Sequence, residues 1–184
     1  MQLQYRALAT QTTVEATTPD GFLCRNVTAA SGRLFTREES GARRAIAVLG
    51  ATVAANLFGQ EDPLGQLVKI GRLPFRVVGV ATPKGADMNG ADQDDFVFIP
   101  LDTGMKRLFH INYIETIYVK AESVDALGGL EVTVRSLLRE RHRLQKGQDD
   151  DFTLQNQRTL LDTALETSEA TNRLVTGVGA ISLL

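Results

Sequence analysis

The chain has 184 residues, with 20 lysines and arginines against 22 aspartates and glutamates, which gives a formal net charge of −2 at pH 7. This near balance gives no electrostatic argument for a nucleic-acid partner, and 43% hydrophobic residues exclude a wholly disordered or collagen-like chain. The single cysteine, Cys24, excludes an internal disulfide, and we expect it to be a small buried side chain.

The N-terminal part predicts strands followed by short helices. Residues 2–18 are polar and β-favouring, and we interpret them as two strands of a meander. Thr18 and Pro19 then predict the start of a short helix, because a capping threonine precedes a proline at the first helical position. Thr36 and Glu39 predict a second short helix that begins with a capping box.

A strand, a helix and a hairpin are predicted next. Residues 45–49 form an apolar run closed by Gly50, and residues 51–58 switch to helical spacing of their apolar side chains. Residues 67–70 and 74–80 are two short β-favouring runs around a glycine-containing turn, which predicts a β-hairpin.

The region from residue 82 to residue 120 predicts a loop and three elements. Residues 82–95 carry two glycines and four aspartates without a clear period, which indicates a long loop. Residues 96–100 predict a buried strand ended by proline, residues 102–109 a helix, and residues 113–120 a further strand.

Two long helices are predicted in the C-terminal part. Residues 124–144 show apolar spacing of three and four, interrupted by two glycines, and residues 152–154 predict a short strand. From residue 157 a second helix is expected, and after Arg173 it loses its polar face. A helix that becomes apolar on all sides is typical of passage from a protein surface into lipid, although no run reaches the ~18 apolar residues of a complete span.

Gly50 and the acidic loop are the candidate nucleotide and metal sites. Gly50 lies at a strand-to-helix junction, but the further glycines or Gly-Lys-Ser/Thr of the nucleotide motifs are missing, so we expect no nucleotide site. Residues 87–95 offer the oxygen ligands that Ca²⁺ prefers, without the order of an EF-hand. We interpret this loop as solvated, with aspartates that cap backbone amides, and a cation site is the alternative.

Catalytic chemistry finds no support in the side chains. His110, His142 and Cys24 are too dispersed for zinc, and no serine lies in a Gly-x-Ser-x-Gly context. We therefore predict that the chain is not an enzyme and has no catalytic, cofactor-binding or metal residues. A run of basic residues lies in the second half of the first long helix; its members are Arg135, Arg139, Arg141, Arg143 and Lys146. We interpret it as a solvated helix face, and the alternative is a surface that contacts an acidic partner or lipid phosphates.

Several segments, in order, resemble the extracytoplasmic core domain of MacB/FtsX-type ABC transporter permeases. They are Ala30-Ser31-Gly32-Arg33-Leu34-Phe35-Thr36, residues 47–59, Asp62-Pro63-Leu64-Gly65, Phe75-Arg76-Val77-Val78-Gly79-Val80, Asp92-Gln93-Asp94-Asp95, residues 97–101, Leu138-Arg139-Glu140-Arg141-His142 and Asp151-Phe152-Thr153.

The resemblance implies an α+β fold, a two-lobed extracytoplasmic domain inserted between the first two transmembrane helices of a four-helix permease. Residues 1–50 and 113–165 would form a porter-like α/β lobe, and residues 51–112 an inserted, smaller, strand-rich α/β lobe. Residues 166–184 would be a helix that leads into a truncated transmembrane segment. The family domain usually also has a helix and a strand before the point that matches Met1.

The function implied by the resemblance is mechanical coupling of cytoplasmic ATP hydrolysis to export or other work outside the membrane. The domain would be periplasmic and part of an inner-membrane protein, and ATP would be used by a separate ABC ATPase domain or subunit. A periplasmic membrane-fusion adaptor and a second permease copy would be partners, and nucleic acid would not. Three alternatives stay open: a lipoprotein-releasing permease domain, an isolated ligand- or cation-binding α/β domain, and an exported hydrolase or peptidase regulator.

Overall fold

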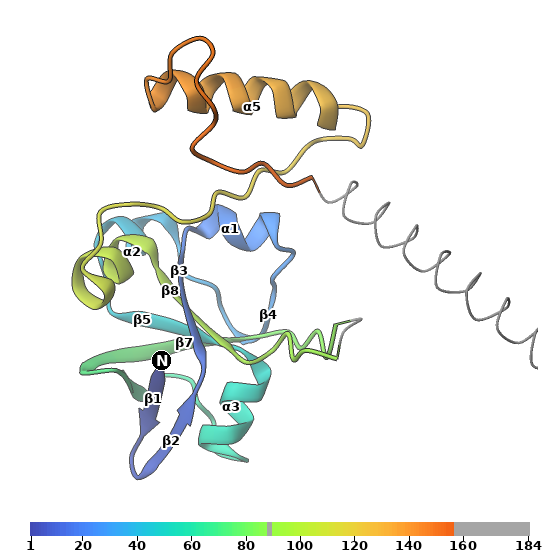
Figure 1. The fold of residues 1–184 in the computed structure, drawn as a ribbon. Coiled ribbons are helices and arrows are strands. Elements are labelled where there is room, and N and C mark those ends of the chain that lie inside the picture. The colour runs from blue at the N-terminus through green and yellow to red at the C-terminus, as the bar shows by residue number, and fades with distance from the viewer. Residues whose placement is uncertain (88–89, 157–184) are drawn as a thin grey trace, which may run out of the picture. The chain divides into compact units, whose positions relative to one another are not determined.

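The computed structural model describes residues 1–87 and 90–156. The chain divides into two compact units, residues 1–119 and 120–184. The first unit contains a β-sheet with short helices, and the described part of the second contains one long helix (Figure 1).

A mixed eight-stranded sheet forms the centre of the first unit. Its strands follow the order β2-β1-β6-β7-β5-β8-β3, and β4 also pairs with β7. The β3–β8 and β5–β7 pairs are parallel, and the other pairs are antiparallel. The strands are β1 Gln2–Tyr5, β2 Leu8–Gln11, β3 Thr13–Thr17, β4 Ala29–Gly32, β5 Ile46–Leu49, β6 Leu67–Ile70, β7 Leu73–Ala81 and β8 Phe96–Pro100.

The sheet is curled, because one short stretch of chain forms the strands at both ends of its order. β2 pairs with β1 and β3 pairs with β8, yet only Thr12 separates β2 from β3. Seven neighbouring strands laid flat would hold these ends about 29 Å apart, since adjacent strands are ~4.8 Å from each other. The sheet therefore bends round until its two ends meet at residues 8–17.

The inside of this curl holds the larger hydrophobic cluster. Side chains from the strands next to both ends of the order meet there, among them Leu3 of β1 and Val97 of β8, which are fully buried. Helix α3 (Ala51–Phe58) adds Val53 and Leu57, also buried, and packs against β1, β2, β7 and β8. One face of the helix thus contributes to the interior that the curled sheet encloses.

A second cluster covers the outer face of the central strands. Phe22 of helix α1 (Pro19–Cys24) packs edge-on against Phe35 and Phe98, with ring centroids 4.7 and 5.3 Å apart. Ile46 and Val48 of β5 belong to this cluster, whereas Ala47 and Leu49 belong to the interior one. β5 is therefore buried on both faces, which explains its continuous apolar run.

Most predicted elements of the first unit are confirmed. Helix α2 (Arg37–Gly41) begins with the predicted capping box of Thr36 and Glu39, and α1 follows Thr18 with proline at its start. The strand β5, helix α3 and hairpin β6–β7 form where they were predicted. The meander differs, because residues 2–17 form three strands rather than two.

Two predictions about later elements are wrong. Residues 113–120 are not a strand, because no strand in the described residues pairs with them; Tyr113, Ile114 and Ile117 are more than half exposed. Residues 152–154 also lack a pairing strand there, and the Phe152 ring instead contacts His142. The helix predicted at 102–109 is confirmed, and it consists of α4 (Leu101–Thr103) followed directly by the π-helix η1 (Gly104–Phe109).

The predicted lobes stay a prediction. Strands from residues 1–50 and from residues 51–112 pair within the same sheet, and the compact units are 1–119 and 120–184. The helix expected from residue 157, including the apolar stretch within residues 166–184, lies outside the described residues.

Helix α5 (Leu127–Arg141) dominates the described part of the second unit. It confirms the long amphipathic helix, although none of its residues is buried. The chain after the helix is held to it through Arg139, which donates to the carbonyl oxygens of Gln145 and Gln148 at 2.9 and 2.8 Å and pairs with Asp150. Among the helices within residues 1–87 and 90–156, none is long and apolar enough to cross a membrane.

Candidate functional site

The acidic loop uses its carboxylates to hold its own backbone. Asp94 is 5% exposed and accepts hydrogen bonds from the amides of Lys84 and Gly85 at 2.8 Å each. Asp92 accepts from the Thr52 hydroxyl at 2.7 Å and from the Asp94 amide at 2.7 Å, and the Thr52 bond is the main reason that the pKa of Asp92 is lowered. The predicted capping of amides is confirmed, but Asp94 is buried rather than solvated.

Gly50 lies where strand β5 turns into helix α3. A Cβ atom at this position would lie 2.1 Å from the carbonyl oxygen of Asp94 and 3.0 Å from that of Phe96. The space in front of the helix is therefore filled by backbone of the acidic loop and of β8. Glycine is required here for close packing, which accounts for it without a phosphate ligand.

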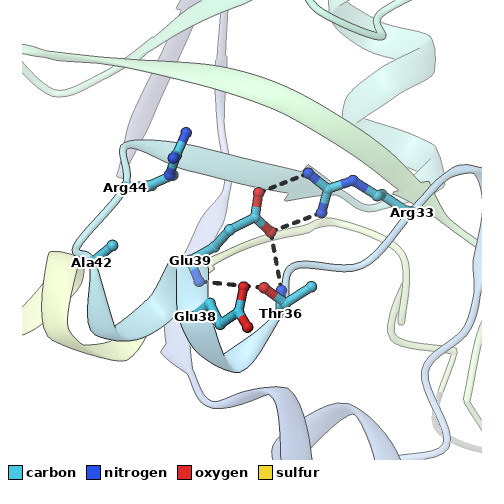
Figure 2. Close-up of a pocket in the computed structure, with 6 residues that line it drawn as sticks. All are labelled: Arg33, Thr36, Glu38, Glu39, Ala42 and Arg44. Carbon is cyan, nitrogen blue, oxygen red and sulfur yellow. Dashed lines mark hydrogen bonds and ion pairs between the residues drawn. The ribbon is translucent and has the colours of Figure 1, made fainter.

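A small pocket lies beside helix α2, lined by Arg33, Thr36, Glu38, Glu39, Ala42 and Arg44 (Figure 2). The guanidinium of Arg33 donates two hydrogen bonds of 2.7 Å to the Glu39 carboxylate, which also accepts from the Thr36 amide at 3.1 Å. These hydrogen bonds, Arg33 foremost, lower the pKa of Glu39 to about 2, with a smaller effect of the Arg44 charge and against the effect of burial. The Glu39 carboxylate is thus already bound by Arg33 and by the Thr36 amide. These hydrogen bonds hold the start of helix α2 to the chain that precedes it.

The histidines and the cysteine remain apart. His110 ends η1 in the left-handed conformation, and His142 ends α5 with Nδ1 2.7 Å from Asp151. Cys24 is half-buried rather than fully buried as expected, with its Sγ 3.7 Å from the carbonyl oxygen of Tyr118. No group of three or more metal-ligating side chains occurs in the part of the chain that the structure describes.

The basic run of α5 is partly neutralised within its own unit. Arg135 and Arg139 both pair with Asp150, and these hydrogen bonds, that from Arg139 first, lower the pKa of Asp150. Arg135 also lies 3.5 Å from Glu131 one turn away. The predicted solvated face is in accord with a helix that has no buried residue.

A groove beside β3 is the feature that the sequence did not reveal. It has a volume of about 690 Å³ and lies between β3, α1, η1 and residues 111–118. Its apolar lining comes from Val14, Ala16, Cys24, Leu101, Met105, Phe109, Ile111, Ile114 and Ile117. The β-favouring residues 113–120 are the sequence signal for one wall of this groove, but their pattern predicts a strand.

A comparison with family models decides the family of this fold. The model described as the MacB-like periplasmic core domain matches residues 2–137. The chain belongs to this family. The resemblance found in the sequence is thereby confirmed.

The relatives are longer proteins. A macrolide export ATP-binding/permease protein MacB from Azoarcus sp. is 38% identical over 174 residues, which cover 95% of this chain and 26% of the relative. A protein of the same name from Chlorobaculum tepidum is 39% identical over 155 residues, which cover 84% of this chain and 24% of the relative. The chain thus spans about a quarter of the length of these relatives.

Two solved structures share the fold. The periplasmic region of MacB from Actinobacillus actinomycetemcomitans has a TM-score of 0.71 at 21% identity, covering 89% of this chain and 70% of that chain. The extracellular domain of the ABC-type transporter YknZ from Gram-positive bacteria has a TM-score of 0.70 at 21% identity, covering 85% and 76%. These matches confirm the predicted mixed fold of helices and strands.

The packing at Gly50 predicts a selective loss of stability. Gly50→Ala should lower the free energy of unfolding by about 1–3 kcal/mol, the usual cost of overpacking a dense interior. Gly41→Ala is the matched control, because a Cβ at Gly41 meets nothing within 4 Å. Urea unfolding of both variants measures the difference, and equal stabilities would show that the contact with Asp94 is not rigid.

The pair of Arg33 and Glu39 predicts a pH-dependent contribution to stability. The folded-state pKa of Glu39 is depressed to about 2, so its contribution is present above the unfolded pKa near 4.5 and is lost as the pH falls through the folded value. Glu39→Gln should cost about 1 kcal/mol at pH 7, because Arg33 is half exposed and solvent screens the pair. Urea unfolding should show this difference shrinking toward pH 2, whereas a difference independent of pH would contradict the assignment.

Proposed function

We propose that this chain is the extracytoplasmic domain of an ABC transporter permease and couples cytoplasmic ATP hydrolysis to export. The observation that supports this most directly is the match of residues 2–137 to the periplasmic core domain family. The curated relatives are named macrolide export ATP-binding/permease proteins, which suggests a macrolide as substrate. The domain would then lie on the periplasmic side of the inner membrane.

The packing of the first unit suits the transmission of displacement. Strand β5 is buried on both faces, and Val53, Leu57 and Phe58 of α3 are buried in the cluster that the sheet encloses. Close-packed interiors have low compressibility and transmit strain. A movement applied to one side of such a unit would reach the other side without being absorbed by deformation.

The partners follow from this proposal. An ABC ATPase domain or subunit in the cytoplasm would supply the energy, and a second permease copy and a periplasmic membrane-fusion adaptor would complete the machine. The porter-like lobe of residues 1–50 and 113–165 and the inserted lobe of residues 51–112 are proposed for the complete protein. A lipoprotein-releasing permease is the alternative, since both kinds of permease use such a domain.

Lowering the folding stability of this domain should abolish export but not ATP hydrolysis. Phe75 of β7 is fully buried in the interior cluster, and Phe75→Ala should cost about 3–5 kcal/mol of folding stability. In the complete permease reconstituted with its ATPase in liposomes, we expect this variant to lose macrolide export and retain ATP hydrolysis, because the chain has no nucleotide-binding motif.

Lys69→Gln is the matched control for this experiment, because Lys69 is exposed on the neighbouring strand β6. Immunoblots of the liposomes establish that both variants are incorporated in equal amounts, and Val77→Ala, a smaller truncation in the same cluster, replaces Phe75→Ala if they are not. Unchanged export, or equal loss of export and hydrolysis in the buried variant, would contradict a coupling role.

A further inference from the structure

The first unit carries charges of opposite sign at the two ends of its sheet. One end holds the starts of β5 and β7 and the end of β8, because β5 runs parallel to β7 and antiparallel to β8. The loop of residues 82–95, which joins β7 to β8, lies at the other end, where the carbonyl oxygen of Asp94 packs against Gly50. Figure 1 shows the described part of this loop to the right of the sheet and η1, in yellow-green, to the left.

Five exposed cations lie at the first of these ends, and we call them the basic end. They are Arg43, Arg44, Arg72, Lys106 and Arg107. The hydroxyl of Thr103, just before η1, donates to the carbonyl oxygen of Arg44 at 3.0 Å. Leu108 of η1 reaches the β6–β7 turn, because a Cβ atom on Gly71 would lie 3.9 Å from its Cδ1. The three segments that carry the basic end therefore adjoin one another.

The basic end has few counter-charges. Within residues 1–87 and 90–156, none of its five side chains forms an ion pair. Of the acidic residues next to them in the chain, Glu39 is paired with Arg33, which leaves Glu38 and Asp102 against five cations. This end of the unit therefore carries an excess of positive charge.

The opposite end carries the compensating negative charge. The loop of residues 82–95 contains Asp87, Asp92, Asp94 and Asp95 against a single cation, Lys84. Residues 1–119 hold equal numbers of basic and acidic side chains, so the unit has a charge difference between its ends without a net charge. A negative surface attracts such a unit in one orientation only, because the acidic end is repelled.

We propose that the basic end docks on an anionic phospholipid surface, with the acidic loop directed away from it. Each lysine or arginine close to such a surface strengthens binding about fivefold, so five of them give stable but salt-sensitive docking. In the complete permease this surface would be the outer leaflet of the cytoplasmic membrane, and that part rests on the proposed function. Binding to a lipid vesicle does not require it.

The arrangement of the cations favours lipid over an acidic protein. The five side chains come from three separate segments, and within the described residues no hydrogen bond fixes any of their charged groups. A guanidinium that recognises one carboxylate is usually held in a bidentate geometry, as Arg33 is at Glu39. A fluid layer of phosphate headgroups needs no such fixed geometry, because its lipids move to meet the cations.

Sedimentation with lipid vesicles tests the docking. The 184-residue chain should sediment at low salt with vesicles of equal parts phosphatidylglycerol and phosphatidylcholine, but not with vesicles of phosphatidylcholine alone. At about 1 M salt, where the Debye length is ~3 Å, it should be released. No binding to the anionic vesicles, equal binding to both kinds, or binding that survives high salt would overturn the proposal.

A matched pair of lysine variants locates the surface. Lys106→Gln should weaken binding to the anionic vesicles about fivefold, and adding Arg72→Gln and Arg107→Gln should weaken it more than tenfold. Lys84→Gln is the control, because it removes the same charge from an exposed residue of the acidic loop, and we expect binding to be unchanged. Circular dichroism verifies that each variant is folded.

The outcomes distinguish this proposal from the proposed function. Equal losses for Lys106→Gln and Lys84→Gln would show that binding follows total charge, and full binding by the triple variant would place the contact elsewhere in the chain. Either result would overturn the docking of the basic end. Neither would change the export and ATP hydrolysis expected for the Phe75→Ala variant, since the vesicle experiment involves no transport.

Discussion

The fold of the first unit depends on the pairing of residues 8–17 with two strands that are distant in the sheet order. The first half of this stretch pairs with β1 and the second half with β8. These two sets of hydrogen bonds draw the ends of the sheet together, and the enclosed space is then filled by α3 and by the inward side chains of six strands. Without them, the same strands would form an open sheet with α3 on one exposed face.

This closure determines where surfaces for function remain. The interior is filled, and the outer face of the central strands is covered by the cluster around Phe22. The outer side of β1 and β6 stays exposed, with Gln2, Gln4 and Lys69 on it, as expected for an antiparallel sheet with one solvated face. The groove beside β3 remains as an apolar recess at the surface of the first unit.

Local patterns in the sequence predicted the local structure well. The capping box at Thr36, the apolar run before Gly50 and the hairpin after Gly65 depend on residues near one another in the chain, so their physics is visible in the sequence. Residues 113–120 show where prediction from neighbouring residues fails. Their β-branched pattern is real, but a strand needs a neighbour, and sequence patterns do not reveal whether a neighbour is present. The groove was missed for the same reason, because it joins β3 to a segment almost 100 residues later.

The proposed function requires that this unit lies outside the cytoplasmic membrane. A single cysteine at the exposed position 69, made by Lys69→Cys with Cys24→Ser and with any other cysteines of the complete permease replaced, reports its location directly. In intact cells with a permeabilised outer membrane, a membrane-impermeant maleimide should label this cysteine fully. Labelling that requires lysis of the inner membrane would place the domain in the cytoplasm and contradict the account.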